Sequence, residues 1–248
     1  MIPNYRNKYK GESILIPDRE GDKKERYKNI PKKCIILYQE QPFNYLKQKY
    51  KSEIKLIDIF SWGCEAYSTK EFCFIRMKGV GSPHVVAIFE EFIALGITEF
   101  LNIGIAGGLS DFGIFLCDKS LRDEGTSQHY FPTSKWSFPD KKLTIRFRDS
   151  LLKRNICFSL AFNWTTDAPF RETKEEVYYY KDNGIKTVDM ETSALFSVAK
   201  YRNVKMVSVL VVSEILNPLC TESANVLEES LIRVVDVGIE CLKEIQNE

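Results

Sequence analysis

The sequence has no long hydrophobic run. Its longest unbroken apolar stretches, 34–38 and 85–89, are five residues each, whereas a membrane-spanning helix needs about 20. We therefore expect no membrane span and no membrane partner. The amino terminus also lacks the apolar segment that is typical of a secretory signal. The seven cysteines are widely spread and form no C-x-x-C motif, which favours free thiols in a reducing cytoplasm.

Histidine is scarce, and neither sign of charge is in excess. The chain has two histidines, no H-E-x-x-H motif and no cysteine–histidine cluster with zinc spacing, so we expect no metal site. The 35 Lys and Arg residues against 34 Asp and Glu give a net charge of +1. A protein that coats nucleic acid would be more basic. The sequence thus predicts neither metal-centred chemistry nor a nucleic-acid partner.

What is present is an ordinary globular composition. The chain has 248 residues, of which 44% are hydrophobic and 28% charged, enough for a sizeable core. Residues 1–33 contain ten basic and five acidic residues and little apolar periodicity. We interpret this segment as a basic N-terminal arm, and residues 34–248 as a single α/β domain.

Hydrophobic patterns predict strands that alternate with helices. Gly79–Pro83 opens one helix, with Ser82 as its N-cap and Pro83 at its first position, and Gly96 ends it. Thr173 begins another helix in a capping box, and Gly184 closes it. The alternation favours a largely parallel or mixed sheet. The predicted strands span 33–38, 54–60, 72–77, 98–103 and 204–212, and the other helices span 191–201 and 224–245.

Familiar catalytic loops are missing. The segment 108–112 has Phe112 where a nucleophile elbow needs glycine, and there is no Walker A loop. Two glycine-rich turns remain, at 79–82 and 104–108, each after a predicted strand. Ligands of open α/β sheets bind at such strand ends, and a helix N-terminus favours an anion or a polar ligand. From the residues alone, both turns can equally be tight connections.

An acidic pair brackets a methionine in the segment 188–194. On a regular helix the carboxylates of Asp189 and Glu191 would point to different faces, so we expect only one of them to reach a pocket. A carboxylate can accept two hydrogen bonds from a vicinal diol, and Met190 offers a flexible apolar surface to a sugar. The alternative is a helix start stabilised by acidic side chains.

Several ordered motifs carry a resemblance to a known family. The chain resembles the nucleoside phosphorylase family, which includes uridine phosphorylase, purine nucleoside phosphorylase and the methylthioadenosine nucleosidases. The uridine phosphorylase branch is the most similar. The motifs are GVGSP at 79–83, EEFIALGITEFLNIGIAGGLS at 90–110, LRDEGTSQHY at 121–130, TTDAPFRET at 165–173 and VDMETSALFSVAKYR at 188–202.

The resemblance implies an α/β fold with a twisted central mixed sheet surrounded by helices. It also implies a homo-oligomer, either a dimer or a trimer of dimers. The implied reaction is cleavage of the N-glycosidic bond of a nucleoside through an oxocarbenium-like ribose. No cofactor is implied beyond phosphate as a co-substrate.

The resemblance also assigns site residues. Met190 and Glu191 would hold the ribose, and the glycine-rich turns would line the ribose and acceptor region through Gly81, Gly104, Ile105 and Gly107. Phe170 would lie at the base, and Arg171 would bind the base or the acceptor unless it is only a surface charge. Glu214 falls where purine-cleaving members carry an aspartate that protonates the departing base, so it could be a general acid or a charge at a strand exit.

Two departures from the family concern phosphate. The phosphate-binding G-D-P-x-R after the first strand is replaced by Tyr38–Pro42, and R-I-G-T reads Asn102–Ile105. Arg171, Arg122 and Arg76 are the candidate substitutes. Three functions therefore stay open: phosphorolysis as the family default, hydrolysis by a nucleosidase, or nucleoside binding without turnover. The sequence decides neither the base, purine or pyrimidine, nor the 5′ substituent, nor the oligomer size.

Overall fold

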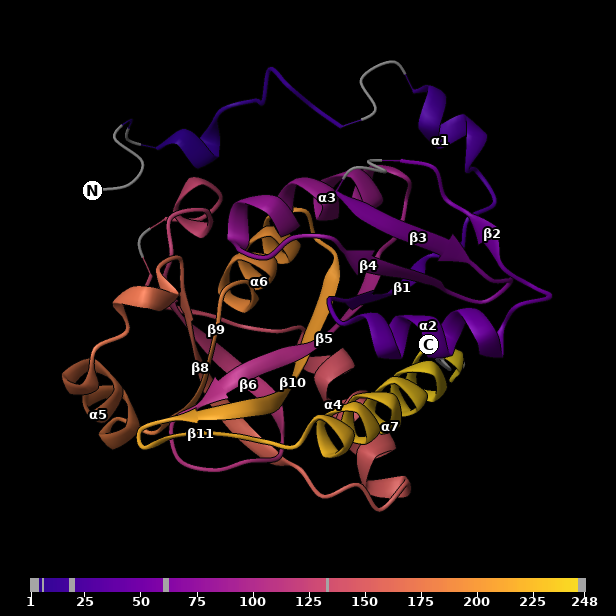
Figure 1. Cartoon of the computed structure of the whole chain (residues 1–248). Helices are drawn as coiled ribbons and strands as arrows, with labels where there is room; N and C mark the ends of the chain where they lie inside the picture. The colour runs from indigo at the N-terminus through magenta and orange to yellow at the C-terminus, as the bar shows by residue number, and fades with distance from the viewer. Residues whose placement is uncertain (1–4, 6, 18–20, 60–62, 133, 245–248) are drawn as a thin grey trace.

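The fold is a mixed β-sheet between two layers of helices (Figure 1). The computed structural model describes residues 5, 7–17, 21–59, 63–132 and 134–244. The strands in these residues are β1 (Lys33–Leu37), β2 (Lys55–Leu56), β3 (Cys64–Ser68), β4 (Cys73–Met77), β5 (Glu99–Gly108), β6 (Ile114–Asp123), β7 (Trp136–Ser137), β8 (Ser159–Thr166), β9 (Ile185–Asp189), β10 (Lys205–Leu216) and β11 (Leu219–Thr221). The helices are α1 (Asp22–Arg26), α2 (Glu40–Lys49), α3 (Ser82–Ala94), α4 (Lys141–Lys153), α5 (Lys174–Asp182), α6 (Thr192–Tyr201) and α7 (Ala224–Lys243), with 3-10 turns at Lys8–Lys10, Ser127–His129 and Pro169–Arg171.

The sheet closes on itself at one side. Its strand order is β11-β10-β6-β8-β9-β5-β1-β4-β3-β2, and β10 also pairs with β5. The strands β5, β9, β8, β6 and β10 therefore form a ring, from which β1, β4, β3 and β2 extend. The pairs β1–β5 and β5–β10 are parallel, whereas β5–β9 is antiparallel. This confirms the predicted mixed sheet surrounded by helices.

Each face of the sheet has its own apolar core, because successive side chains of a strand point to opposite faces. In β1, Ile35 and Leu37 pack in the core under α2, α4 and α7. Cys34 and Ile36 pack in the other core, under α3 and α6. All four of these side chains are fully buried. The continuous apolar run of this strand therefore reflects burial on both faces.

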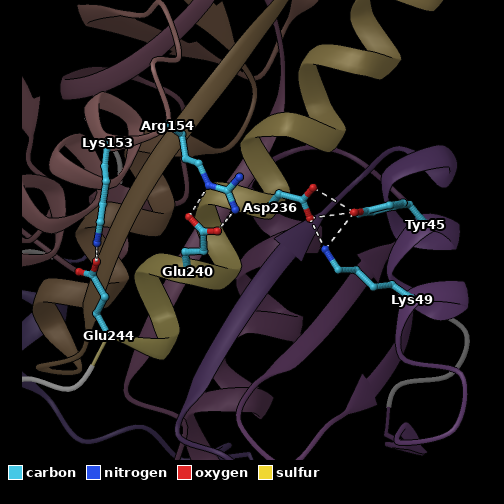
Figure 2. Close-up of polar contacts among 7 residues, drawn as sticks. All are labelled: Tyr45, Lys49, Lys153, Arg154, Asp236, Glu240 and Glu244. Atoms are coloured by element: carbon cyan, nitrogen blue, oxygen red, sulfur yellow. Dashed lines mark hydrogen bonds and ion pairs between the residues drawn. The ribbon is translucent and has the colours of Figure 1, made fainter.

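Polar contacts connect α7 to the two helices beside it (Figure 2). From α2, the Tyr45 hydroxyl donates to Asp236 at 2.9 Å, and Lys49 Nζ lies 2.6 Å from the same carboxylate. At the end of α4, Arg154 pairs with Glu240 through two guanidinium nitrogens. Ion pairs on the surface contribute little to stability, so the apolar core under α7 holds this helix more than these pairs do.

The N-terminal segment lies along α3 (Figure 1). Lys23 pairs with Glu91 of α3 at 2.8 Å, and Tyr27 and Ile30 pack against the core under α3 and α6. β1 begins at Lys33, where the predicted arm ends. None of the described helices is long and apolar enough to cross a membrane.

Several predicted boundaries hold, and others are wrong for identifiable reasons. Thr173 caps α5 by accepting from the Glu176 N–H, as predicted. The cap of α3 is Gly81 instead of Ser82, because the Ser82 hydroxyl donates to the Met190 carbonyl at 2.7 Å. The expected loop at 104–108 is the second half of β5, held by pairing with β10.

Two further predictions were too long. The strand expected at 54–60 is reduced to β2, and position 60 lies outside the described residues. The last helix ends at Lys243, while position 245 likewise lies outside them.

Candidate active site

A cavity of about 540 Å³ opens where several strands end. Tyr38 and Gln39 directly follow β1, and Asp189 ends β9. The second half of β5, which pairs with β9, and the end of β10 also line the cavity. Carboxyl ends of strands are where α/β folds bind their ligands. The lining residues are Tyr38, Gln39, Val80, Asn102, Gly104–Gly107, Pro169, Phe170, Glu172, Val188–Glu191, Leu210, Ser213, Glu214, Leu216 and Leu219.

Glu191 is held at the cavity wall by backbone donors. The Gly81 N–H donates to Glu191 Oε1 at 2.5 Å, and the Met190 N–H donates to Oε2 at 3.3 Å. Gly81 has a φ of +95°, so glycine is required for its N–H to take this direction. Burial, and then the charge of Asp189, raise the pKa of Glu191 to about 8. The carboxyl is therefore harder to ionise than an ordinary glutamate, and a positive charge that develops beside it would favour its ionised form.

Asp189 has a different role from Glu191. We expected the acidic pair to lie on one helix, but it does not. Asp189 ends β9, and Glu191 is the N-cap of α6. The Asp189 carboxylate accepts from the Thr192 N–H and from the Thr165 and Asn163 side chains, at 2.7–2.9 Å. Asp189 thus stabilises the start of α6, which was the alternative considered for Glu191. Glu191 is left to face the cavity.

The two segments that depart from the family's phosphate motifs contact each other. The Tyr38 hydroxyl donates to Asn102 Oδ1 at 2.9 Å, and Asn102 Nδ2 donates to Ser208 at 2.8 Å. The Tyr38 ring lies against Gly104, where an added Cβ would be 3.1 Å from it. Beside it, Gln39 Oε1 is buried and accepts from none of the described donors. This side of the cavity is therefore polar and, in the described residues, has no basic side chain; burial first, and then the carboxyls of Glu191 and Asp189, raise the pKa of Tyr38.

The opposite end of the cavity combines an exposed ring with two carboxyls. Phe170 is 98% exposed and belongs to the 3-10 turn Pro169–Arg171. Glu172 follows this turn, and Glu214 comes from β10, where the Ser213 hydroxyl donates to Glu214 Oε2 at 2.7 Å. Burial, and then the charges of Glu176 and Glu214, raise the pKa of Glu172 to about 7.

Among the described residues, no Lys, Arg or His side chain lines this cavity. Arg122 is buried, and its guanidinium donates to the Ser127 side chain and to the carbonyls of 131, 132 and 134. Arg76 faces Glu65, at 3.7 Å. Arg171 is exposed and is not part of the wall. The three arginines considered as phosphate ligands thus lie elsewhere.

Most of the site residues predicted from the sequence line the cavity. Gly104, Ile105, Gly107, Phe170, Met190, Glu191 and Glu214 line it, and Gly81 contacts it through Glu191. Arg171 is the predicted residue that it leaves out. Sequence reasoning gave no role to Gln39 or Glu172, and it treated Tyr38 and Asn102 only as departures. For Tyr38 and Gln39, their position directly after β1 was the signal that could have indicated them.

Comparisons with known proteins indicate the family of the chain. The family model described as the phosphorylase superfamily matches residues 40–246. An uncharacterized protein of Acanthamoeba polyphaga mimivirus is 31% identical over 142 residues, a match that spans about half of either chain (55% of this one and 54% of the other). A DeoD-type purine nucleoside phosphorylase of Streptococcus thermophilus is 23% identical over 174 residues, covering 66% of this chain and 79% of its own.

Solved structures show the same fold. AMP nucleosidase from Bacteroides thetaiotaomicron superposes with a TM-score of 0.71 at 20% identity, covering 89% of this chain and 96% of its own. Purine nucleoside phosphorylase from Toxoplasma gondii superposes with a TM-score of 0.73 at 13% identity, covering 87% and 92%. At these identities the likeness concerns the fold alone.

Proposed function

The chain belongs to the phosphorylase superfamily, and from this premise we propose that it is a nucleosidase, which cleaves the N-glycosidic bond of a nucleoside with water as the acceptor. The observation that carries the choice of water is that the described cavity wall has no basic side chain to hold phosphate. Fold does not by itself decide between water and phosphate. The choice of acceptor depends on the residues that would have to hold it.

Phosphate requires a cation or strong donors when it leaves water. A phosphate dianion is costly to desolvate without them. The described cavity wall offers no basic side chain, and it includes the carboxyl-bearing residues Glu172, Asp189, Glu191 and Glu214. These carboxyl groups supply no positive charge to offset the desolvation cost. The same reasoning argues against a phosphate on the 5′ position of the ribose.

Water can bind to the polar groups on the Tyr38 and Gln39 side of the cavity. Gln39 Oε1 is a buried acceptor at this side of the cavity, and a buried acceptor without a donor costs about 1–3 kcal/mol. A water molecule that donates to Gln39 would remove this cost. The ring of Tyr38, held through Asn102, limits the room beside Gly104. A small neutral acceptor therefore fits better than a tetrahedral dianion.

At the ribose, Glu191 and Met190 take the roles that the family resemblance implies. The Glu191 carboxyl would accept hydrogen bonds from the ribose diol, while the Met190 side chain covers an apolar face. When the bond to the base breaks, the ribose becomes oxocarbenium-like and positive. An ionised Glu191 then interacts more strongly with it than with the neutral substrate, which is the differential binding that catalysis needs.

Two further properties belong to this proposal. A homo-oligomer follows from the family resemblance. A cytoplasmic location is supported by the seven cysteines, which are all free, because exposed thiols persist in a reducing compartment.

The decisive experiment is to measure base release with and without phosphate. A panel of purine and pyrimidine nucleosides is incubated in phosphate-free buffer, and the sugar product is identified. We expect undiminished release, with free ribose as the product and no ribose 1-phosphate when phosphate is added. Release that depends on phosphate and yields ribose 1-phosphate would overturn the nucleosidase in favour of a phosphorylase. Binding of a nucleoside without any release would overturn both.

A further inference from the structure

A chain of hydrogen bonds runs from the cavity wall into the core. Tyr38 and Asn102 line the cavity, and the Tyr38 hydroxyl lies 2.9 Å from Asn102 Oδ1. Asn102 Nδ2 lies 2.8 Å from Ser208 Oγ, which is 3.0 Å from Thr192 Oγ1. Thr192 Oγ1 in turn lies 2.5 Å from Asp189 Oδ2. The chain thus joins the residue after β1 to the end of β9 through β5, β10 and α6.

The carboxylate at the inner end decides which way the hydrogens of this chain point. Asp189 Oδ1 accepts from the side chains of Thr165 and Asn163. Asp189 Oδ2 accepts from both the N–H and the hydroxyl of Thr192. A carboxylate only accepts, and a hydroxyl has one hydrogen to donate. The Thr192 hydroxyl therefore gives its hydrogen to Asp189 and can only accept from Ser208.

The other hydrogens follow in sequence. Because Ser208 donates to Thr192, it can only accept from Asn102. This requirement turns the amide nitrogen of Asn102 toward Ser208 and its oxygen toward Tyr38. The raised pKa of Tyr38 keeps its hydroxyl protonated, so the hydroxyl donates its one hydrogen to Asn102. Toward the cavity, the Tyr38 hydroxyl therefore offers lone pairs and no hydrogen.

We propose that the Tyr38 hydroxyl accepts a hydrogen bond from the attacking water and so positions it against the ribose. Asn102, Ser208 and Thr192 are positioning residues, because they fix the direction of this hydroxyl. The inference rests on the proposed cleavage by water and names the residues that determine the choice of acceptor. Water can donate to Tyr38. The charged oxygens of phosphate need donors, and this hydroxyl has none to offer.

The step balances without any further reactant. The bond between C1′ and the base breaks, and its electron pair stays with the base. The water oxygen bonds to C1′, and the proton that water loses equals the one that the base gains through solvent. Tyr38 takes no proton and stays neutral throughout.

The variant Tyr38→Phe tests the hydroxyl itself, because it keeps the ring and removes the acceptor. We expect kcat to fall by roughly 3- to 10-fold, the size of one hydrogen bond. The KM for the nucleoside should not change, since the hydroxyl acts on the water. Tyr178→Phe, exposed on α5, is the matched control and should behave as wild type. A raised KM at unchanged kcat would show that Tyr38 binds the nucleoside and would overturn the proposal.

A double-mutant cycle tests whether Asn102 acts through Tyr38. Asn102→Leu removes the acceptor of the Tyr38 hydrogen and leaves the hydroxyl free to turn, so kcat should fall, at most as far as in Tyr38→Phe. Added to Tyr38→Phe, the same substitution should cause no further loss, because the hydroxyl is already gone. Losses that multiply would show a structural role and overturn the proposal. If Asn102→Leu does not fold, Ser208→Ala interrupts the chain one residue further in, and the same cycle applies.

The direction of the Tyr38 hydrogen can also be measured without turnover. The Raman doublet of tyrosine distinguishes a hydroxyl that donates from one that only accepts. The difference spectrum between wild type and Tyr38→Phe isolates Tyr38 from the other tyrosines, and we expect it to report a donor. A Tyr38 hydroxyl that does not donate would overturn the proposal. The product analysis above tests water as the acceptor and does not depend on this spectrum, so the two proposals can fail separately.

Discussion

Positions 189 and 191 show how two similar side chains acquire opposite roles within three residues. Asp189 is buried and accepts hydrogen bonds from Thr192, Thr165 and Asn163. Glu191 accepts only backbone N–H groups, from Gly81 and Met190, in the described residues. The hydrogen bonds of the Asp189 carboxylate stabilise the fold, whereas the Glu191 carboxyl is available to a ligand.

Replacing Glu191 by glutamine should therefore reduce activity without unfolding the protein. Glutamine keeps the shape but cannot ionise, so the charge-assisted hydrogen bond that an ionised Glu191 would make to the positive, oxocarbenium-like ribose is lost. Such a bond contributes about 1.5–3 kcal/mol, which corresponds to roughly 10- to 150-fold in kcat/KM. Steady-state kinetics on the best nucleoside of the panel measures this loss. Glu229→Gln, exposed on α7, is the control, and wild-type kinetics in a folded Glu191→Gln protein would remove Glu191 from the site.

The helix α4 packs one face in the core and exposes the other. Leu151 is fully buried in the core under α2, α4 and α7, while the next residue, Leu152, is 57% exposed. Adjacent residues on a helix point about 100° apart, so one side chain can pack on the sheet while its neighbour meets water.

These two leucines provide a matched pair for a stability measurement. Leu151→Ala should lower the free energy of unfolding by about 2–5 kcal/mol, because it leaves a cavity in the core. Leu152→Ala should change it by less than about 0.5 kcal/mol, as surface substitutions do. Urea denaturation of both variants measures the difference. Equal costs would mean that α4 is not packed on the sheet in the way described.

For the whole molecule, the acidic residues of the cavity should make the free energy of unfolding depend on pH. Glu172 and Glu191 have folded-state pKa values raised to about 7 and about 8, above the 4.5 of an ordinary glutamate. Below pH 4.5 these groups are protonated in both states. As the pH rises from 4.5 to about 8, both glutamates ionise in the unfolded chain before they ionise in the folded protein. The free energy of unfolding that they contribute below pH 4.5 is therefore lost over this range.

We expect the unfolding temperature to fall less steeply between pH 5 and pH 8 in Glu172→Gln and Glu191→Gln than in wild type. Glutamine stays neutral in both states and so carries no such pH dependence. Thermal unfolding at a series of pH values measures the slopes, with Glu229→Gln as the reference. Slopes in the two cavity variants that match the reference would contradict the raised pKa values. If the raised pKa values hold, Glu191→Gln combines lower activity with higher stability at pH 8, as expected when a charged site serves function.

The sequence by itself determined those features that depend on neighbours in the chain. The α/β class, the start of α5 at Thr173 and its end at Gly184 follow from local patterns and from the conformations that glycine permits. The resemblance of its ordered motifs, Met190 and Glu191 among them, indicated the family that the family model then confirmed.

Only the tertiary structure decided how the cavity is built, because its contacts join residues far apart in the chain. The hydrogen bond from Tyr38 to Asn102 joins two strands and explains two departures from the family pattern at once. Gly81 replaces Ser82 as a helix cap because a carbonyl 108 residues away takes the Ser82 hydroxyl. Glu172 has a raised pKa because folding buries it and places it near the charges of Glu176 and of the distant Glu214. Burial and long-range charge, which local patterns do not encode, determine these features.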